Sequence, residues 1–290
     1  MLAASVAALS AAAATLQEMI DAAKPGDTIT LPDGVWREKV RIPREKRALA
    51  IVHEGPGRAV VEWGDYAALT NSAGEALGTF RTWTMKVEAD DVRLEGLWIR
   101  NTASDANVAA GGRGVGQAVA LHIEGDGVEV AKCRISGHQD TLYVSQGVKE
   151  WAREPEYTRY CAQHFEECLI EGTVDFIFGQ SRAVFDRCEI RSLLRGYITA
   201  AATPEGREGF FFRRCRITAA PGVKTLLGRP WRPHAQVVFD GCVMDDCIKS
   251  EGWSQWRPND GTDKTAFFAE YNCTGMGAET SRRLPWIKIK

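Results

Sequence analysis

A short frame recurs along the chain at intervals of a few tens of residues, and this repeat constrains the fold more than any other feature. In each copy a large apolar residue is followed by two residues, a cysteine, one residue, and an isoleucine or methionine. The copies span residues 130–135, 165–170, 185–190, 212–217 and 239–244, with a weaker copy at Cys273 and an earlier one at 94–99 that has leucine in place of cysteine. Successive cysteines lie 35, 20, 27, 27 and 31 residues apart, and self-similarity at this period is typical of a solenoid.

Each copy is interpreted as a strand, because its apolar runs are short, rich in Val, Ile and Phe, and bounded by Gly, Asp and Arg. Helical repeats would instead show apolar residues at every third or fourth position over a dozen residues. Since strand side chains alternate, the cysteine and isoleucine of a copy share one face. The sequence therefore predicts an all-β parallel β-helix over residues 15–290 as a single domain. The cysteines are expected to form an interior ladder of free thiols, and a disulfide framework is the alternative.

One short helix is expected near the start of the chain. Thr15 and Glu18 form a capping-box pattern, apolar residues follow, and Pro25 with Gly26 ends the segment. Such a helix is suitably placed to cover the first coil of a solenoid. Residues 1–14 are predicted to be a tail or a remnant, and the polar segment 145–163 is predicted to be a projecting loop that shapes a binding face.

Charge and hydropathy exclude several functions. The net charge of −2 gives no general attraction to nucleic acid or to a membrane surface. No run of 18 apolar residues is present, and the first basic residue is Lys24, so a secretory signal with a positive start is lacking. Together with reduced cysteines this favours a cytoplasmic location, with secretion as the alternative if the true N-terminus is missing. A monomer is expected.

Common catalytic motifs are missing from the sequence. There is no G-x-S-x-G elbow, no H-E-x-x-H, no phosphate-binding loop and no C-x-x-C pair. Four polar segments do interrupt apolar strands, and they span residues 116–121, 137–143, 172–179 and 227–231. Gln117 and Gln139 are one coil of 22 residues apart, and Asp140 and Asp175 are one coil plus the 145–163 loop apart. Stacking of coils would bring these side chains and Arg229 together.

Taken singly, each of these residues has an ordinary structural explanation. A glutamine or aspartate in a protein of strands and turns usually forms turns, and Arg229 could simply stack on Trp231. An ionised carboxylate between Val174 and Phe176, however, is costly unless it is paired, and Arg229 is the available partner. The combination therefore favours a site.

The segments together resemble the pectin methylesterase family. Its pattern runs G-x-Y-x-E, Q-A-V-A-L, Q-D-T-L, D-F-I-F-G and L-G-R-P-W in that order, and it is matched here at residues 34–38, 117–121, 139–142, 175–179 and 227–231. The last four matches are letter for letter, and the likeness covers roughly residues 15–260. Trp36 replaces the tyrosine of the first motif, and the 145–163 loop looks longer than in plant-type members.

The resemblance implies a right-handed parallel β-helix that hydrolyses galacturonate methyl esters without a metal or cofactor. Matching positions make Asp175 the nucleophile, Asp140 the acid and then the base, and Gln117 and Gln139 the oxyanion donors. Arg229 would hold Asp175 and lower its pKa, while the neighbouring charge raises the pKa of Asp140. The sugar groove is expected to be lined by Trp231, Trp253, Phe176 and Tyr143. The substrate would be methyl-esterified homogalacturonan or its oligosaccharides.

Three other interpretations stay open at this point. A β-helix lyase acting on polygalacturonate would need a calcium-binding carboxylate cluster, and a glycoside hydrolase would need a carboxylate pair flanking the glycosidic bond. The glutamine-rich pattern argues against both enzymes. A β-helix that only binds sugar or protein is a third possibility, which the set of Asp140, Asp175 and Arg229 disfavours.

Overall fold

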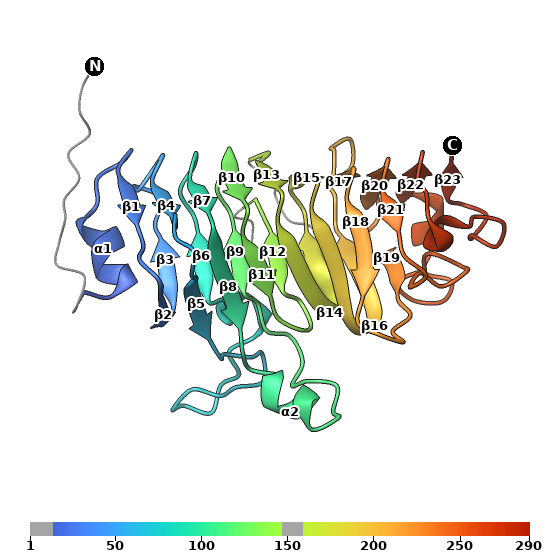
Figure 1. Cartoon of the computed structure of the whole chain (residues 1–290). Coiled ribbons are helices and arrows are strands. Elements are labelled where there is room, and N and C mark those ends of the chain that lie inside the picture. The colour runs from blue at the N-terminus through green and yellow to red at the C-terminus, as the bar shows by residue number, and fades with distance from the viewer. Residues whose placement is uncertain (1–13, 147–158) are drawn as a thin grey trace, which may run out of the picture.

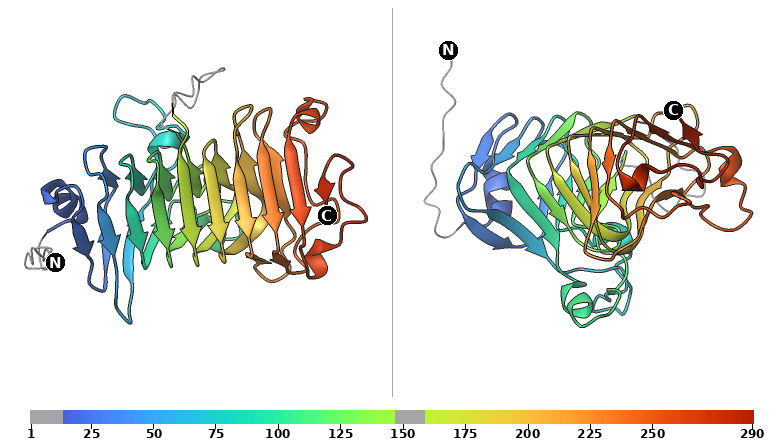
Figure 2. Two further views of the ribbon diagram at one scale, coloured as in Figure 1. Left: turned by 90° about the horizontal axis from the view of Figure 1, so that it is seen from above. Right: turned by 45° about the vertical axis from the view of Figure 1, so that its right-hand side comes forward.

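The computed structural model describes residues 14–146 and 159–290, which form coils of short parallel strands stacked along one axis (Figures 1 and 2). The first face of the stack is formed by β1 (Thr28–Thr30), β4 (Ala50–Val52), β7 (Arg93–Glu95), β10 (Val128–Ala131), β13 (Ala162–Glu166), β15 (Arg182–Asp186), β17 (Phe210–Arg213), β20 (Gln236–Asp240), β22 (Phe267–Tyr271) and β23 (Lys288–Ile289). The second face is formed by β2 (Gly34–Arg37), β5 (Ala59–Trp63), β8 (Leu97–Asn101), β11 (Arg134–Ser136), β14 (Leu169–Gly179), β16 (Glu189–Ala201), β18 (Arg216–Ala219) and β21 (Val243–Met244).

A third row of strands joins the second through the two longest strands. It contains β3 (Val40–Ile42), β6 (Met85–Val87), β9 (Leu121–Ile123), β12 (Leu142–Val144) and β19 (Leu226–Pro230), together with the second halves of β14 and β16. The first half of β14 pairs with β11 and its second half pairs with β12, all in parallel register. The predicted right-handed parallel β-helix with a short N-terminal helix is confirmed.

The recurring frame does not lie in one strand, so that part of the sequence interpretation is wrong. In the copy at 130–135 the valine lies in β10, the cysteine lies in the turn that follows, and the isoleucine lies in β11 on the next face. Lys132, just before the cysteine, has a φ of 52°, and the matching residues of the next two copies, Glu167 and Arg187, have φ values of 53° and 51°. A left-handed residue reverses the twist of the chain and turns it sharply, so the frame marks a corner of the coil.

The N-terminal end of the stack is closed by α1 (Leu16–Ala22), as the sequence predicts (Figure 1). Thr15 and Glu18 form the expected capping box, and Leu16 and Ile20 are fully buried. Glu38 adds a contact that the sequence did not reveal: its two carboxylate oxygens accept hydrogen bonds of 2.8 and 3.0 Å from the backbone N–H groups of Leu16 and Gln17. A carboxylate at a helix N-terminus satisfies free N–H groups and the helix dipole. Glu38 therefore fixes the cap to the first coil.

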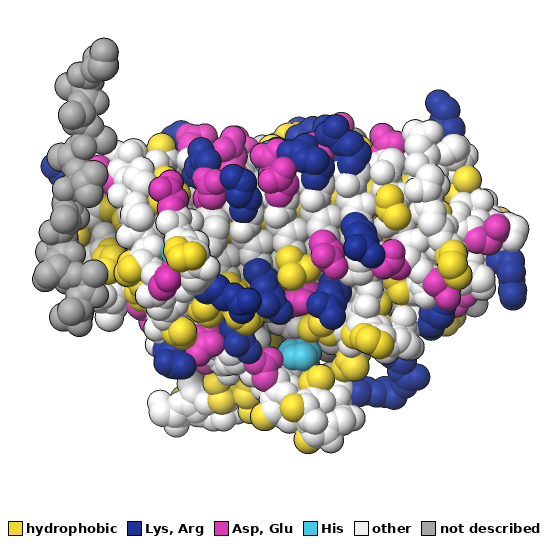
Figure 3. Space-filling model, in the orientation of Figure 1, with side chains coloured by type: hydrophobic (Ala, Val, Ile, Leu, Met, Phe, Trp, Pro, Cys, Tyr) yellow, Lys and Arg dark blue, Asp and Glu magenta, His cyan; other side chains and the backbone are white. Residues whose placement is uncertain are grey.

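The remaining helical turns lie outside the stack. They are α2 (Asp105–Ala109), η1 (Thr79–Arg81), η2 (Thr262–Lys264) and η3 (Met276–Ala278). α2 projects from one side of the coils, and η3 lies at the C-terminal end (Figures 1 and 2). Among the described residues, no helix is long and apolar enough to cross a membrane. Basic and acidic side chains are interspersed along the upper edge of the molecule in Figure 3. Ion pairs between coils include Arg187 with Glu167 and Arg214 with Asp186.

The interior holds a ladder of cysteines next to a ladder of phenylalanines. Phe185, Phe212 and Phe239 stack at centroid distances of 4.5 and 4.4 Å, and their planes are tilted by less than 10°. All eight cysteines are free thiols, and seven are buried. Burial raises the pKa of the Cys133 thiol to about 12. A protonated, inaccessible thiol is a poor nucleophile, so the ladder serves packing.

We expect the native protein to resist thiol alkylation and the unfolded protein to take up label at all eight cysteines without any reductant. The reason is that all eight thiols are free, while seven of them are buried and out of reach of the reagent. Mass spectrometry after alkylation in the presence and absence of denaturant measures both states. Finding most cysteines bridged would contradict the thiol ladder, and it would also remove the support for the cytoplasmic location, which stays a prediction.

Candidate active site

Asp140 and Asp175 stand at kinks of two successive coils. Asp140 lies between β11 and β12, and Asp175 lies within β14 where the register with β16 shifts. The N–H of Asp140 donates a 3.0 Å hydrogen bond to the carbonyl of Val174, which ties the two kinks together. Both aspartates have positive φ, 63° and 51°, a conformation that aspartate tolerates better than most residues. Strained residues of this kind concentrate at functional sites.

Arg229 of β19 binds Asp175 with both ends of its planar fork. Its Nε donates to Oδ1 at 2.9 Å and its Nη2 donates to Oδ2 at 2.5 Å. The neighbouring Gly228 lets β19 approach this closely, because a Cβ at that position would lie 1.9 Å from the Oγ1 of Thr199 on β16. The pairing of Asp175 with Arg229, predicted from the cost of a buried carboxylate, is confirmed by this geometry.

The two carboxyl groups sit in different electrostatic surroundings. Burial raises the pKa of Asp140 well above its ordinary value, and the nearby charge of Asp175 raises it further, against a smaller opposing effect of Arg229. Burial also raises the pKa of Asp175, while the hydrogen bonds and charge of Arg229 pull it down. Arg229 thus lowers the pKa of Asp175 as predicted, but burial outweighs the guanidinium and the net pKa stays above its ordinary value. Of the two aspartates only Asp175 is hydrogen-bonded to Arg229, so Asp175 loses its proton at a lower pH than Asp140.

Gln117 and Gln139 are brought side by side, as the coil spacing predicted. They form a parallel bridge, and the N–H of Ala118 donates to the carbonyl of Gln139 at 3.0 Å. Both residues are half-buried, and within residues 14–146 and 159–290 neither side-chain amide makes a hydrogen bond. Their N–H groups are thus available to a ligand beside Asp140.

Of the four aromatic residues predicted to line a groove, only Trp231 is partly exposed. Phe176 is fully buried in the main core, so its assignment to the groove is wrong. The kink at Asp175 interrupts the alternation of side chains, and both Phe176 and Ile177 consequently point inward. Phe178 instead reaches the outer face, where its ring centroid lies 6.0 Å from that of Trp231.

Tyr143 also differs from the prediction, and Trp253 meets it only in part. Tyr143 belongs to the outer aromatic cluster but has no exposed surface, and its hydroxyl is hydrogen-bonded to Gln180. Trp253 is 1% exposed, and its ring packs against Phe239 and Phe268 at centroid distances of 5.8 and 4.6 Å. Tyr143 therefore does not face a ligand directly, whereas Trp253, although almost fully buried, contributes to the lining of a cavity of about 860 Å³.

Phe178 is not among the residues predicted from the sequence to line the groove. A signal existed in the register, because Phe178 pairs with Tyr143 on the neighbouring coil and with Ala200 on the next. Once one of these positions is placed on the outer face, its partners must follow. No group of three or more His, Cys, Asp or Glu side chains in the described part of the chain is arranged to hold a metal ion.

A carboxylate paired with an arginine, a second buried carboxyl group and two glutamines beside one another on a parallel β-helix form an arrangement expected of a carboxylic ester hydrolase. Comparison with known proteins identifies the group more closely. The chain belongs to the pectinesterase family, whose profile matches residues 5–290.

Individual relatives agree with this placement. Pectinesterase 31 of Arabidopsis thaliana is 34% identical over 285 residues, which cover 94% of this chain and 83% of the relative. The structure is similar to the pectin methylesterase from carrot, with a TM-score of 0.79, 26% identity and coverage of 95% and 84% of the two chains. It is also similar to a pectin methylesterase in complex with a hexasaccharide, with a TM-score of 0.74, 26% identity and coverage of 95% and 88%.

Proposed function

We propose that this chain hydrolyses the methyl esters of galacturonate units in pectin or pectic oligosaccharides and releases methanol. The observation that carries the proposal is the bidentate contact of Arg229 with Asp175 beside the buried Asp140. One carboxyl group is thereby ionised and oriented while its neighbour is protonated at the same pH. The family and its hexasaccharide-bound member support pectic chains as the substrate class.

The first half of the reaction uses both aspartates. The carboxylate of Asp175 attacks the ester carbonyl carbon, and the amides of Gln117 and Gln139 stabilise the resulting oxyanion. As the bond from carbon to methoxide breaks, Asp140 donates its proton and methanol leaves. The galacturonate acyl group is then joined to Asp175 as an anhydride.

The second half regenerates the enzyme. Asp140, now ionised, accepts a proton from a water molecule whose oxygen attacks the galacturonate carbonyl of the anhydride. The carboxylate of Asp175 departs, and Arg229 again neutralises it. The product is a free galacturonate carboxyl group, and both aspartates return to their starting protonation states.

A direct assay separates this function from its rivals. Methanol release and ultraviolet absorbance of unsaturated uronides are followed together on highly esterified pectin. An esterase gives methanol alone, a lyase gives absorbance, and a glycoside hydrolase gives new reducing ends with neither signal. A protein that only binds sugar gives no product at all.

We expect esterase activity to survive excess EDTA. In the proposed mechanism the ester is polarised by the two amides and attacked by Asp175, so no step depends on a metal ion. Initial rates of methanol release before and after chelation measure this, with a calcium-dependent lyase treated in parallel to show that chelation is complete. Loss of methanol release that calcium restores would contradict the proposed metal-free mechanism, whereas calcium-dependent ultraviolet absorbance would indicate a lyase.

A further inference from the structure

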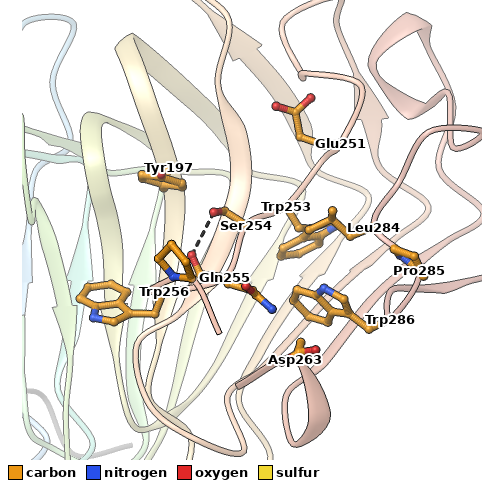
Figure 4. A pocket seen from close by; sticks show the side chains of 11 residues that line it. Tyr197, Glu251, Trp253, Ser254, Gln255, Trp256, Asp263, Leu284, Pro285 and Trp286 are labelled. Atoms are coloured by element: carbon orange, nitrogen blue, oxygen red, sulfur yellow. Dashed lines mark hydrogen bonds between the residues drawn. The ribbon is translucent and has the colours of Figure 1, made fainter. Parts of the chain in front are cut away.

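The guanidinium of Arg229 is contacted by two aromatic rings as well as by Asp175. Tyr197 on β16 and Trp256 in the connection from β21 to η2 each place a ring centroid 4.1 Å from its Cζ. Both rings are half-buried, and both border a cavity of about 860 Å³ (Figure 4). A guanidinium over a tryptophan ring is attracted by the ring's electrons, and more strongly where water is excluded. The guanidinium of Arg229 is thus held by two aromatic rings in addition to the carboxylate of Asp175.

The segment that carries Trp256 is attached directly beside Arg229. The N–H of Leu227 donates to the carbonyl of Gly252 at 2.7 Å, and the N–H of Ser254 donates to the carbonyl of Gly228 at 3.1 Å. These bonds pair residues 252–254 with β19 as a short parallel bridge between Trp253 and Gly228. Gly228 is the residue directly before Arg229. Any displacement of this segment would therefore move Trp256 relative to the guanidinium.

A buried ion pair fixes the same segment from behind. Glu270 on β22 and Arg283 are joined by hydrogen bonds of 2.8 and 2.9 Å, and their side chains are 1% and 3% exposed. Glu270 also accepts a 2.8 Å hydrogen bond from the indole N–H of Trp253, and Arg283 donates to the carbonyls of Lys249 and Ser250. A buried pair persists only when further hydrogen bonds satisfy it, and here those bonds go to the segment that leads to Trp256.

We propose that Trp256 is a positioning residue for the reaction, which orients the guanidinium of Arg229 toward both oxygens of Asp175 and is itself held in place by the Glu270–Arg283 pair. This role rests on the proposed function in so far as Asp175 is the nucleophile. The described groups that face Asp175 are Asp140 from the preceding coil and Arg229 from β19, with Tyr197 behind Arg229. If the guanidinium of Arg229 were less well oriented, its hydrogen bonds to Asp175 would weaken. The pKa of Asp175, which burial raises and Arg229 lowers, would then rise.

The test compares Trp256→Leu, which keeps bulk without a ring, with Trp256→Phe, which keeps a ring. Trp256→Leu should lower kcat about tenfold and move the acid limb of the kcat profile to higher pH, whereas Trp256→Phe should stay within about twofold of the parent. Trp98→Leu is the matched control, because Trp98 also has an arginine, Arg134, 4.1 Å from its ring but lies on the second face away from the aspartates. This control should change neither kcat nor the pH profile.

A second readout does not depend on turnover. Carbon-13 NMR of labelled aspartate carboxyl groups follows the titration of Asp175, whose signal is identified by its loss in Asp175→Asn. An upward shift in Trp256→Leu and not in Trp256→Phe supports the proposal. An increase in KM at unchanged kcat and unchanged titration would make Trp256 a substrate contact only, and a lower Tm with unchanged titration would make it merely structural; either result overturns the proposal. If the parent protein releases no methanol but the titration of Asp175 is still shifted in Trp256→Leu, the proposed function is wrong. The role of Trp256 in orienting Arg229 would then still hold.

Discussion

Replacing Asp175 by asparagine is expected to abolish methanol release, lowering kcat by about 10³-fold or more, while the β-helix remains folded. Asparagine is nearly the same size, and it tolerates the φ of 51° at this position as aspartate does. It lacks the ionised oxygen that attacks the ester, so no anhydride can form. Alanine would be a poorer choice, because it would add backbone strain at the same position.

The measurement is the initial rate of methanol release, with circular dichroism and Tm recorded on the same preparations. Asp186→Asn serves as the control, because Asp186 is also paired with an arginine, Arg214, but on the first face of the stack. The control should keep full activity. If Asp175→Asn retains more than a few per cent of the parental rate, Asp175 is not the nucleophile.

The architecture was predictable because the residues that recur along the chain are apolar side chains that lie in the interior of the coils. Cysteine and isoleucine recur at fixed spacing, and a stack of coils buries them in contiguous ladders that no helical arrangement would produce. The meeting of Gln117 with Gln139, and of Asp175 with Arg229, followed from coil spacing together with the cost of an unpaired buried charge.

The errors come from backbone angles that residue types do not specify. Lysine, glutamate and arginine occupy left-handed corners before the cysteines, and nothing in their identity announces a turn there. In the same way, the left-handed conformation of Asp175 decides that Phe176 points inward and Phe178 outward, although the strict alternation of an extended strand would give a different assignment.

Long-range packing accounts for the rest. Whether Trp253 faces a groove or the core depends on Glu270, 17 residues later in the chain, which accepts its indole N–H. Likewise, the raised pKa of Asp175 reflects burial by several coils, and the sequence showed only the attractive partner. These properties depend on contacts between segments whose spacing carries no repeat.

Arg229→Ala is expected to lower kcat by about 10²- to 10³-fold with little change in KM, because removing one partner leaves the other buried and unpaired. Arg229 now donates to both oxygens of Asp175, at 2.9 and 2.5 Å. Without it, burial acts alone on Asp175 and raises its pKa further. The nucleophile then needs a higher pH to be ionised, and the acid limb of the kcat profile moves upward.

Arg229→Lys separates charge from geometry in the same experiment. Lysine keeps a positive charge near Asp175, so the acid limb should move less than in the alanine variant. It cannot present two parallel N–H groups to the carboxylate, and it loses the planar contact with Tyr197 and Trp256, so kcat should still fall by about tenfold. The expected order of kcat is therefore parent, lysine, alanine, and KM should vary little among the three.

The control for both substitutions is Arg134, another arginine that binds a buried carboxylate, Glu171, on the second face of the stack. Arg134→Ala should lower Tm without moving the pH profile, because Glu171 takes no part in the proposed chemistry. A distinct result would overturn the role given to Arg229. If Arg229→Ala raises KM while kcat and the acid limb stay unchanged, Arg229 binds a carboxylate of the substrate, and the orientation of Asp175 must come from another residue.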